Sequence, residues 1–165
     1  MSVVIPVDRL DAVITKIFEH TTCEPDEAAL LSKYLVDANL AGHDSHGVLR
    51  TSRYVTWLES GALHAGRSIK IVSENDSMAI IDGDYGMGHW VANQAVNFGI
   101  EKAKANGCYI EALRNAGHVG RVGSWAINAA DQGLVSVHFV NARGSVLVCL
   151  LYTSDAADEV LGVVL

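Results

Sequence analysis

Apolar residues recur at helical spacing through the N-terminal part of the chain and predict three helices. Over residues 7–20 one stripe is formed by Leu10, Val13, Ile14, Ile17 and Phe18. Pro25 opens a second helix, because proline is tolerated in the first turn, and this helix ends near Gly42. Its inner face is predicted to carry Leu31, Tyr34, Leu35 and Ala38. A third helix follows Gly47 and stops at Gly61, with one side formed by Tyr54, Trp57 and Leu58.

Beyond Gly66 the pattern changes to short apolar strands that alternate with helices. In chain order we predict strand, strand, helix, strand, helix and strand at residues 68–72, 78–81, 89–104, 108–113, 124–131 and 134–140. The first helix of this series has a narrow stripe of small residues, which lets a helix lie close to a sheet. The strands at 108–113 and 134–140 are nearly continuous apolar runs, typical of strands covered on both faces. The fold class is therefore α/β, with a helical N-terminal region ahead of alternating strands and helices.

Composition supports an ordered globular domain. Hydrophobic residues make up 50% of the chain and charged residues 19%, which is unlike a disordered sequence. The formal net charge of -7, with its basic residues scattered, argues against a nucleic-acid-binding surface. A small anionic substrate stays possible, because one arginine can hold a carboxylate whatever the net charge.

Cysteine usage and the absence of targeting segments predict a cytoplasmic protein. The three cysteines are far apart and suggest no disulfide framework, which fits a reduced compartment. The N-terminus lacks the basic segment and long apolar stretch of a signal peptide. The longest apolar run, residues 146–152, is too short to cross a bilayer.

The densest polar group is the sequence HDSH at residues 43–46, followed by Arg50. His46 and Arg50 are four residues apart, so a helix that carries both would present them to the same cleft. Together they suit a hydroxy acid, because a guanidinium binds the carboxylate and an imidazole exchanges the hydroxyl proton. The alternative is structural: Asp44 or Ser45 would cap the third helix.

A second candidate is the glycine-rich sequence GHVGRVG at residues 117–123, between a predicted strand and a predicted helix. Glycines at such a junction let the backbone approach a ligand, and a helix N-terminus favours an anion. The spacing is not that of the dinucleotide fingerprint, and the GMG sequence at 86–88 is a weaker match still. The alternative is a tight turn that leaves His118 on the surface.

Seven histidines also raise the possibility of a metal site. His43 and His46 are three residues apart, and Asp44 with His89 or His118 could complete a ligand set. No H-E-x-x-H or Cys/His ligand spacing is present, so we predict no metal. Three further histidines are interpreted as structural: His20, His64 and His138, the last inside a strand.

Several of these motifs together resemble the malate/L-lactate dehydrogenase family. This family includes ureidoglycolate dehydrogenases, bacterial hydroxycarboxylate dehydrogenases and cyclic-imine reductases. The N-terminal signature is matched by residues 41–50 (AGHDSHGVLR), Tyr54 and Gly61. The later matches follow in the same order: residues 82–83 (DG), the helix at 86–104, 115–121 (NAGHVGR) and 135–140 (VSVHFV). The resemblance covers residues 6–148.

The resemblance implies an α/β fold of the family's own, distinct from a Rossmann domain. It implies a cytoplasmic homodimer that moves a hydride between NAD or NADP and C2 of a small 2-hydroxy or 2-oxo acid. Malate, lactate, ureidoglycolate or a cyclic imine are all candidate substrates. No nucleic-acid or membrane partner is expected.

The resemblance also assigns roles to particular residues. His118 matches the proton acceptor of the ureidoglycolate branch. Ser45 and His46 match a pair that, in the imine-reductase branch, forms a relay with a downstream aspartate. Arg50 matches a substrate-carboxylate position. His46 and Asn141 are predicted to contact the cofactor.

Two departures from the family pattern concern the C-terminal part. Family members are considerably longer, and their additional half carries much of the cofactor site. After residue 148 they continue toward a Pro-Phe/Trp-Gly-Gly stretch, whereas this chain has CLLYTSDAADE at 149–159, which looks like a translated sequencing-library adaptor. We therefore predict that residues 1–148 are the N-terminal part of a dehydrogenase domain and that 149–165 are a non-native tail. A genuine variant C-terminus is the alternative.

The favoured function is oxidation of a 2-hydroxy acid, with Arg50 orienting the carboxylate and His118 or His46 accepting the proton. The truncated chain is expected to be inactive by itself. One alternative is a metal-dependent hydrolase built on His43, Asp44 and His46. The other is a non-catalytic folding or dimerisation fragment.

Overall fold

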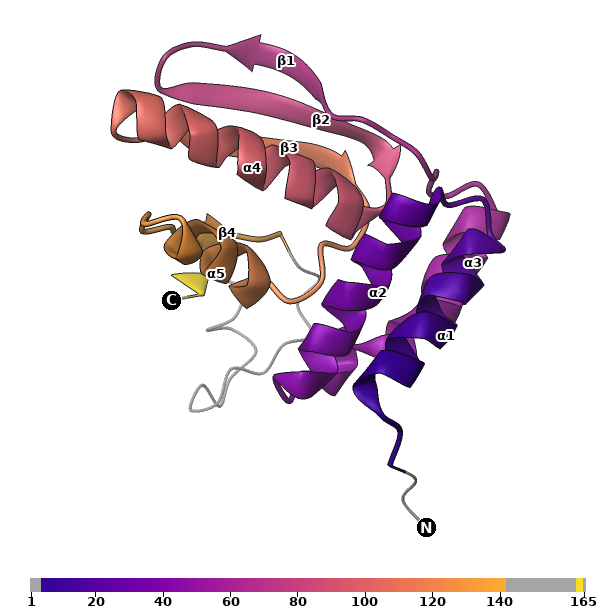
Figure 1. The fold of residues 1–165 in the computed structure, drawn as a ribbon. Helices are drawn as coiled ribbons and strands as arrows, with labels where there is room; N and C mark the ends of the chain where they lie inside the picture. Colours follow the sequence, from indigo (N-terminus) through magenta and orange to yellow (C-terminus); the bar gives the residue numbers. More distant parts are fainter. Residues whose placement is uncertain (1–3, 142–162, 165) are drawn as a thin grey trace, which may run out of the picture. The chain divides into compact units, whose positions relative to one another are not determined.

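The computed structural model describes residues 4–141 and 163–164, and the chain divides into two compact units (Figure 1). The first unit comprises Met1–Arg121 and the second Val122–Leu165. Each unit is described by itself. None of the helices formed by the described residues is long and apolar enough to span a bilayer.

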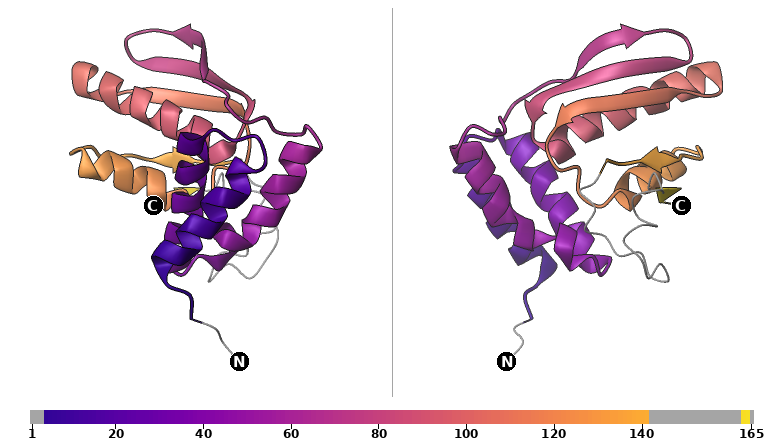
Figure 2. Two further views of the ribbon diagram at one scale, coloured as in Figure 1. Left: turned by 45° about the vertical axis from the view of Figure 1, so that its right-hand side comes forward. Right: turned by 180° about the vertical axis from the view of Figure 1, so that it is seen from behind.

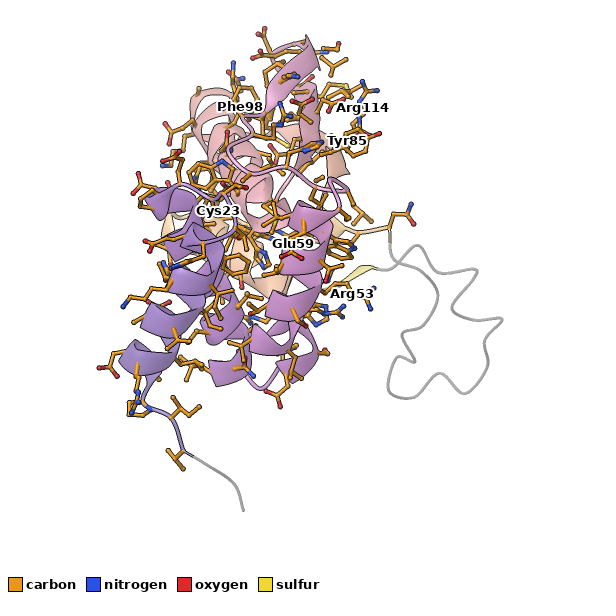
Figure 3. The ribbon with its side chains drawn as sticks, turned by 90° about the vertical axis from the view of Figure 1, so that its right-hand side faces the viewer. Cys23, Arg53, Glu59, Tyr85, Phe98 and Arg114 are labelled. Carbon is orange, nitrogen blue, oxygen red and sulfur yellow. The ribbon has the colours of Figure 1, made fainter. Side chains whose placement is uncertain are left out.

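Three helices open the first unit, as predicted: α1 (Val7–Glu19), α2 (Pro25–Leu40) and α3 (Thr51–Glu59). The third helix begins later than predicted, because two 3-10 turns, η1 (Asp44–His46) and η2 (Val48–Arg50), precede it. In the side-chain view Arg53 and Glu59 mark α3 (Figure 3).

The core of the helical part is formed by large side chains from all three helices. Its fully buried members include Phe18, Leu31, Leu35 and Tyr54. The stripe predicted on α1 is narrower than expected, since Val13 and Ile17 are exposed. The predicted inner face of α2 is confirmed at Leu31, Leu35 and Ala38.

A three-stranded sheet follows, with strand order β1-β2-β3 (Figure 2). It is formed by β1 (Lys70–Glu74), β2 (Met78–Gly86) and β3 (Ile110–Ala116). β1 and β2 are antiparallel, whereas β2 and β3 are parallel and are joined through α4 (Gly88–Asn106). The predicted element types are therefore confirmed, although β1 lies two residues later than expected and β2 extends to Gly86.

Only one face of this sheet is covered in the described structure. Ala79 and Ile81 of β2 are buried and pack with Ala95 of α4. On the opposite face Met78 and Ile110, which are paired across β2 and β3, are 44% and 63% exposed. The apolar run at 108–113 predicts a strand covered on both faces; among the described residues α4 covers one face of this sheet, and side chains that alternate to the other face are exposed.

The second unit contains the predicted helix as α5 (Gly123–Asp131) and a short antiparallel pair, β4 (His138–Phe139) with β5 (Val163–Val164). The predicted buried strand at 134–140 is wrong: two of its residues form a strand, and Val135 is 98% exposed. His138 lies in this strand, as predicted, and its Nε2 contacts Ser136 Oγ at 3.0 Å. The predicted tail at 149–165 lies outside the described residues except for Val163 and Val164.

A buried carboxylate ties α2 to the segment that leads into the sheet. Glu27 is 1% exposed, and its Oε2 accepts the backbone N–H of Gly66 at 2.7 Å. Burial raises the pKa of Glu27, and the Gly66 N–H and the neighbouring Cys23 thiol offset part of that rise. The charged form of Glu27 therefore opposes folding, whereas the protonated form does not.

Replacing Glu27 by Gln is expected to stabilise the protein at neutral pH, because Gln keeps an acceptor for Gly66 and carries no buried charge. Since the folded-state pKa is raised, the favourable contribution of Glu27 is present below its unfolded pKa and is lost as pH rises through its folded value. We expect Tm to rise by about 2–4 °C at pH 7.5, equivalent to about 1 kcal/mol, and by less at pH 4. Glu59→Gln, on the exposed part of α3, is the control. An equal shift at both pH values, or a drop in Tm for Glu27→Gln, would contradict this account.

Candidate active site

The polar corner between α2 and α3 is held by a residue that the sequence analysis did not consider. Asn39 Nδ2 donates to Asp44 Oδ1 at 2.5 Å, and Asn39 Oδ1 accepts the backbone N–H of Val48 at 2.8 Å. A Cβ at position 47 would lie 2.1 Å from Asn39 Oδ1, so the corner requires Gly47. Asn39 thereby fixes the backbone on both sides of His46.

The capping alternative for this corner is wrong. α3 begins at Thr51, and neither its N-cap nor those of the two 3-10 turns has a side-chain cap hydrogen bond. Asp44 accepts instead from Asn39, and Ser45 Oγ lies 2.9 Å from His46 Nδ1. The side chains of Asp44 and Ser45 therefore contact Asn39 and His46 and do not cap a helix.

Arg50 lies beside His46, although the single helix expected to carry both is absent: the two residues end successive 3-10 turns separated by Gly47. Its Nε donates to the backbone oxygen of Ser45 at 2.6 Å, which orients the guanidinium. Burial lowers the pKa of His46, and the positive charge of Arg50 and then His43 lower it further. His46 is thus a neutral imidazole next to a fixed cation.

The glycine-rich segment packs against the first turn of α4. Gly117 N donates to Gly86 O at 3.0 Å, and a Cβ at Gly88 would lie 2.1 Å from His118 O. These glycines allow two segments of the protein's own backbone to come close together. The two glycine motifs noted in the sequence form one contact, and that contact sets the position of His118.

His118 is brought to the polar corner and is not a surface residue of a tight turn. Its ring stacks on that of His46, with centroids 5.3 Å apart and planes inclined by 27°. Its Nδ1 lies 2.7 Å from the hydroxyl of Tyr54 on α3. Burial, then Arg50 and His46, lower the pKa of His118 to about 4.

A third histidine lies behind this pair. His89 is 1% exposed, and its ring stacks on Tyr34 with centroids 5.7 Å apart. Burial, then His118 and His46, lower its pKa to about 3, so it is neutral. Gly120 has a φ of +74°, and a Cβ there would lie 2.0 Å from His89 Nε2. His89 thus supports the segment that carries His118.

The structure brings four of the five predicted site residues together: Ser45, His46, Arg50 and His118. Asn141 is exposed and lies in the second unit, so its cofactor role stays a prediction. The metal alternative finds no support. In residues 4–141 and 163–164 no group of three or more His, Cys, Asp or Glu side chains is placed to hold a metal ion. The exposed His43 ring instead contacts Ala41 O at 3.0 Å.

Sequence reasoning missed the site roles of Tyr54 and His89. Tyr54 was expected on one side of the third helix, without a polar partner. No spacing signal could have found this role, because His46, Arg50 and Tyr54 lie in three successive elements, η1, η2 and α3. His89 was considered only as a metal ligand, and nothing in its local sequence indicates that it underlies the 117–120 segment.

The arrangement can bind an anion and exchange a proton. A guanidinium binds carboxylates through two parallel hydrogen bonds. Two neutral imidazoles in contact with it can accept or donate hydrogen bonds to an oxygen on the neighbouring carbon of the same ligand. A site that interconverts a 2-hydroxy acid and a 2-oxo acid needs both functions side by side: a group that binds the carboxylate and a group that exchanges a proton with the oxygen on C2.

Comparison with known proteins agrees with this chemistry. The family model described as malate/L-lactate dehydrogenase matches residues 5–157. Hydroxycarboxylate dehydrogenase B of Escherichia coli (strain K12) is 38% identical over 147 residues, which are 89% of this chain and 41% of that protein. Malate dehydrogenase of Pyrococcus abyssi is 36% identical over 158 residues, 96% of this chain and 42% of that protein.

Solved structures show the same relationship. Malate dehydrogenase from Pyrococcus horikoshii OT3 superimposes with a TM-score of 0.77 at 36% identity, over 79% of this chain and 38% of that one. Sulfolactate dehydrogenase from Methanocaldococcus jannaschii gives a TM-score of 0.76 at 33% identity, over 79% and 38%. The chain spans about 40% of the length of the curated relatives it matches. The resemblance found in the sequence is confirmed, and the chain belongs to the malate/L-lactate dehydrogenase family.

Proposed function

We propose that this chain is the N-terminal part of an oxidoreductase that transfers a hydride between NAD or NADP and C2 of a small 2-hydroxy acid. The observation that carries the proposal is the contact of His46 and His118 beside Arg50. Relatives are named malate, L-lactate, L-sulfolactate and hydroxycarboxylate dehydrogenases, after acids that carry a hydroxyl group as well as a carboxylate. A malate- or lactate-like acid is therefore the substrate class.

Arg50 holds the substrate carboxylate in this proposal. Its Nε is engaged with Ser45 O, which fixes the plane of the guanidinium and leaves the terminal nitrogens for two-point binding. The site is locally cationic although the whole chain carries a net charge of -7. An acid bound there would place its C2 oxygen beside the stacked imidazoles.

The hydroxyl proton is exchanged with the histidine pair. Both rings have a lowered pKa, so both are neutral at pH 7 and one can accept a proton as the hydride leaves C2. Bound substrate carboxylate would also stabilise the imidazolium that forms, because it adds a negative charge beside the pair.

The reaction requires a hydride acceptor, and the site residues can move protons but cannot accept a hydride. The nicotinamide supplies that acceptor when bound. Two buried polar atoms near the site, Thr51 Oγ1 and Arg121 Nε, have no hydrogen-bond partner among the described residues, as expected where a ligand completes the contacts. His46 and Asn141 are the residues that we propose to contact the cofactor. By family resemblance the full-length enzyme is a cytoplasmic homodimer.

A second part of the proposal concerns the activity of the isolated 165-residue chain. Because it spans about 40% of its relatives, we infer that the isolated 165 residues lack part of the cofactor site and are inactive. A non-catalytic folding or dimerisation fragment is the competing description. Titration of the full-length protein with NADH, followed by NADH fluorescence, separates the two: binding supports the dehydrogenase, and no binding supports the non-catalytic description. The isolated 165-residue chain should bind weakly or not at all.

Arg50→Lys in the full-length enzyme is expected to raise KM for the hydroxy acid at least tenfold, with a smaller effect on kcat. Lysine cannot reproduce the planar two-point contact with a carboxylate or the bond from Nε to Ser45 O. A tenfold loss corresponds to about 1.4 kcal/mol. Arg53→Lys is the matched control, since Arg53 lies on the exposed side of α3 with its guanidinium 5.9 Å from the centre of the Trp57 ring. An unchanged KM for Arg50→Lys would show that Arg50 does not bind the substrate carboxylate.

His118→Ala and His46→Ala are both expected to lower kcat, and the variant that lacks the proton acceptor should lose more, about 10²–10⁴-fold, the usual value of general acid–base catalysis. Because the pKa of both rings is lowered, the acid limb of the wild-type kcat/KM profile should lie well below pH 6.5. His20→Ala, an exposed residue whose Nδ1 contacts Lys16 O at the end of α1, should leave both quantities unchanged. If neither site variant lowers kcat by tenfold, the histidine pair has no catalytic role.

A further inference from the structure

We propose that Tyr54 is a positioning residue that keeps the hydrogen of neutral His118 on Nε2, so that His118 donates a hydrogen bond to the C2 oxygen of the substrate while His46 accepts the hydroxyl proton. The proposal rests on the proposed function and assigns different roles to the two stacked histidines. It starts from the 2.7 Å contact between Tyr54 Oη and His118 Nδ1.

The hydroxyl of Tyr54 is enclosed in the helical core. The side chain is 1% exposed, and its ring contacts Phe18 and Trp57 at centroid distances of 6.4 and 5.7 Å. Within the described part of the chain, His118 Nδ1 is the hydrogen-bond partner of this hydroxyl. A buried O–H without an acceptor is unfavourable, so the phenol proton is directed at Nδ1.

That direction of donation fixes the tautomer of His118. Burial raises the pKa of Tyr54, which keeps the phenol protonated and therefore a donor. When Tyr54 donates to Nδ1, Nδ1 carries a lone pair, and a neutral imidazole then has its one hydrogen on Nε2. His118 cannot accept a proton at Nε2 in this state, but it can donate a hydrogen bond from it.

His46 is held differently. Its Nδ1 lies 2.9 Å from Ser45 Oγ, and Ser45 is exposed. An exposed hydroxyl can donate to solvent and accept from Nδ1–H, so nothing forces the hydrogen of His46 onto Nε2. Nε2 of His46 can therefore carry the lone pair that a proton acceptor needs. The difference between the two rings arises from a buried phenol on one side and an exposed serine on the other.

The resulting step balances in both directions. In oxidation the hydroxyl proton passes to His46 Nε2 and the C2–O bond becomes a carbonyl; a bound nicotinamide would supply the acceptor for the hydrogen that leaves C2 with its electron pair. The new carbonyl oxygen accepts the hydrogen bond from His118 Nε2–H. In reduction the same N–H polarises the carbonyl of a 2-oxo acid, and the His46 imidazolium returns the proton to the C2 oxygen after hydride arrives.

The direct test is the position of the hydrogen on His118, measured by ¹⁵N NMR of histidine-labelled full-length protein at pH 7, with His118→Gln to assign its signals. We expect a protonated Nε2 and an unprotonated Nδ1 in the wild type. Tyr54→Phe should shift the population toward the other tautomer. Tyr34→Phe is the matched control, because the ring of half-buried Tyr34 also contacts that of His89, but its hydroxyl donates to Asn93 Oδ1 and not to His118. A wild-type His118 with its hydrogen on Nδ1 overturns the proposal, and this result does not depend on any variant that could fail to fold.

A kinetic measurement tests the consequence for catalysis. Donation from Tyr54 opposes protonation of Nδ1, so Tyr54→Phe should move an acid limb of the kcat/KM profile to higher pH and lower kcat at least tenfold, while Tyr34→Phe leaves the limb in place. The groups that face His118 are Arg50, His46 and His89, and all are retained in both variants. Unchanged limbs in Tyr54→Phe overturn the positioning role. If the wild type has the expected tautomer but no dehydrogenase activity, the proposed function fails and the Tyr54–His118 assignment of the hydrogen stands.

Discussion

The close approach of the 117–120 segment to the first turn of α4 is the contact on which the site depends. Side chains at Gly88 and Gly120 would collide with His118 O and His89 Nε2, at 2.1 and 2.0 Å. Without that approach His118 could not reach the helical part of the fold, where Tyr54 and His46 lie. The glycines therefore act through packing, by allowing two backbone segments to come together. This role of glycine differs from that in glycine-rich loops that bind a phosphate group.

The local charge of the site follows from its burial and not from the net charge of the chain. Burial is the largest cause of the lowered pKa of His46, His89 and His118. Arg50 lowers the pKa of His46 and His118 further, and neighbouring histidines add to the effect at each ring. The site thus combines a permanent cation with neutral rings. This combination suits an anionic substrate whose neighbouring oxygen changes between hydroxyl and carbonyl, because the cation binds both forms and the rings handle the proton.

The sequence predicts the parts of the fold that depend on local pattern. The three N-terminal helices, α4 and the central strands follow from apolar spacing and from glycine and proline positions. His46 and Arg50 lie together as expected, but two 3-10 turns and not one helix carry them. The predictions fail where distant segments decide the outcome. Asn39 determines the shape of the corner at Gly47 from an earlier helix, and His89 supports a segment that follows β3. The apolar run at 134–140 predicts a buried strand, but burial requires covering elements that an apolar run does not itself specify.

We propose that Arg50 and the histidine pair bind the same small acid, Arg50 at its carboxylate and the histidines at its C2 oxygen. The most direct measurement is a crystal structure of the full-length enzyme with a cofactor and oxamate, an unreactive analogue of a 2-oxo acid. We predict that the carboxylate contacts the terminal nitrogens of Arg50 and that the amide oxygen lies within hydrogen-bond distance of His118 Nε2. An oxamate bound elsewhere, with Arg50 and His118 both out of contact, would contradict the account.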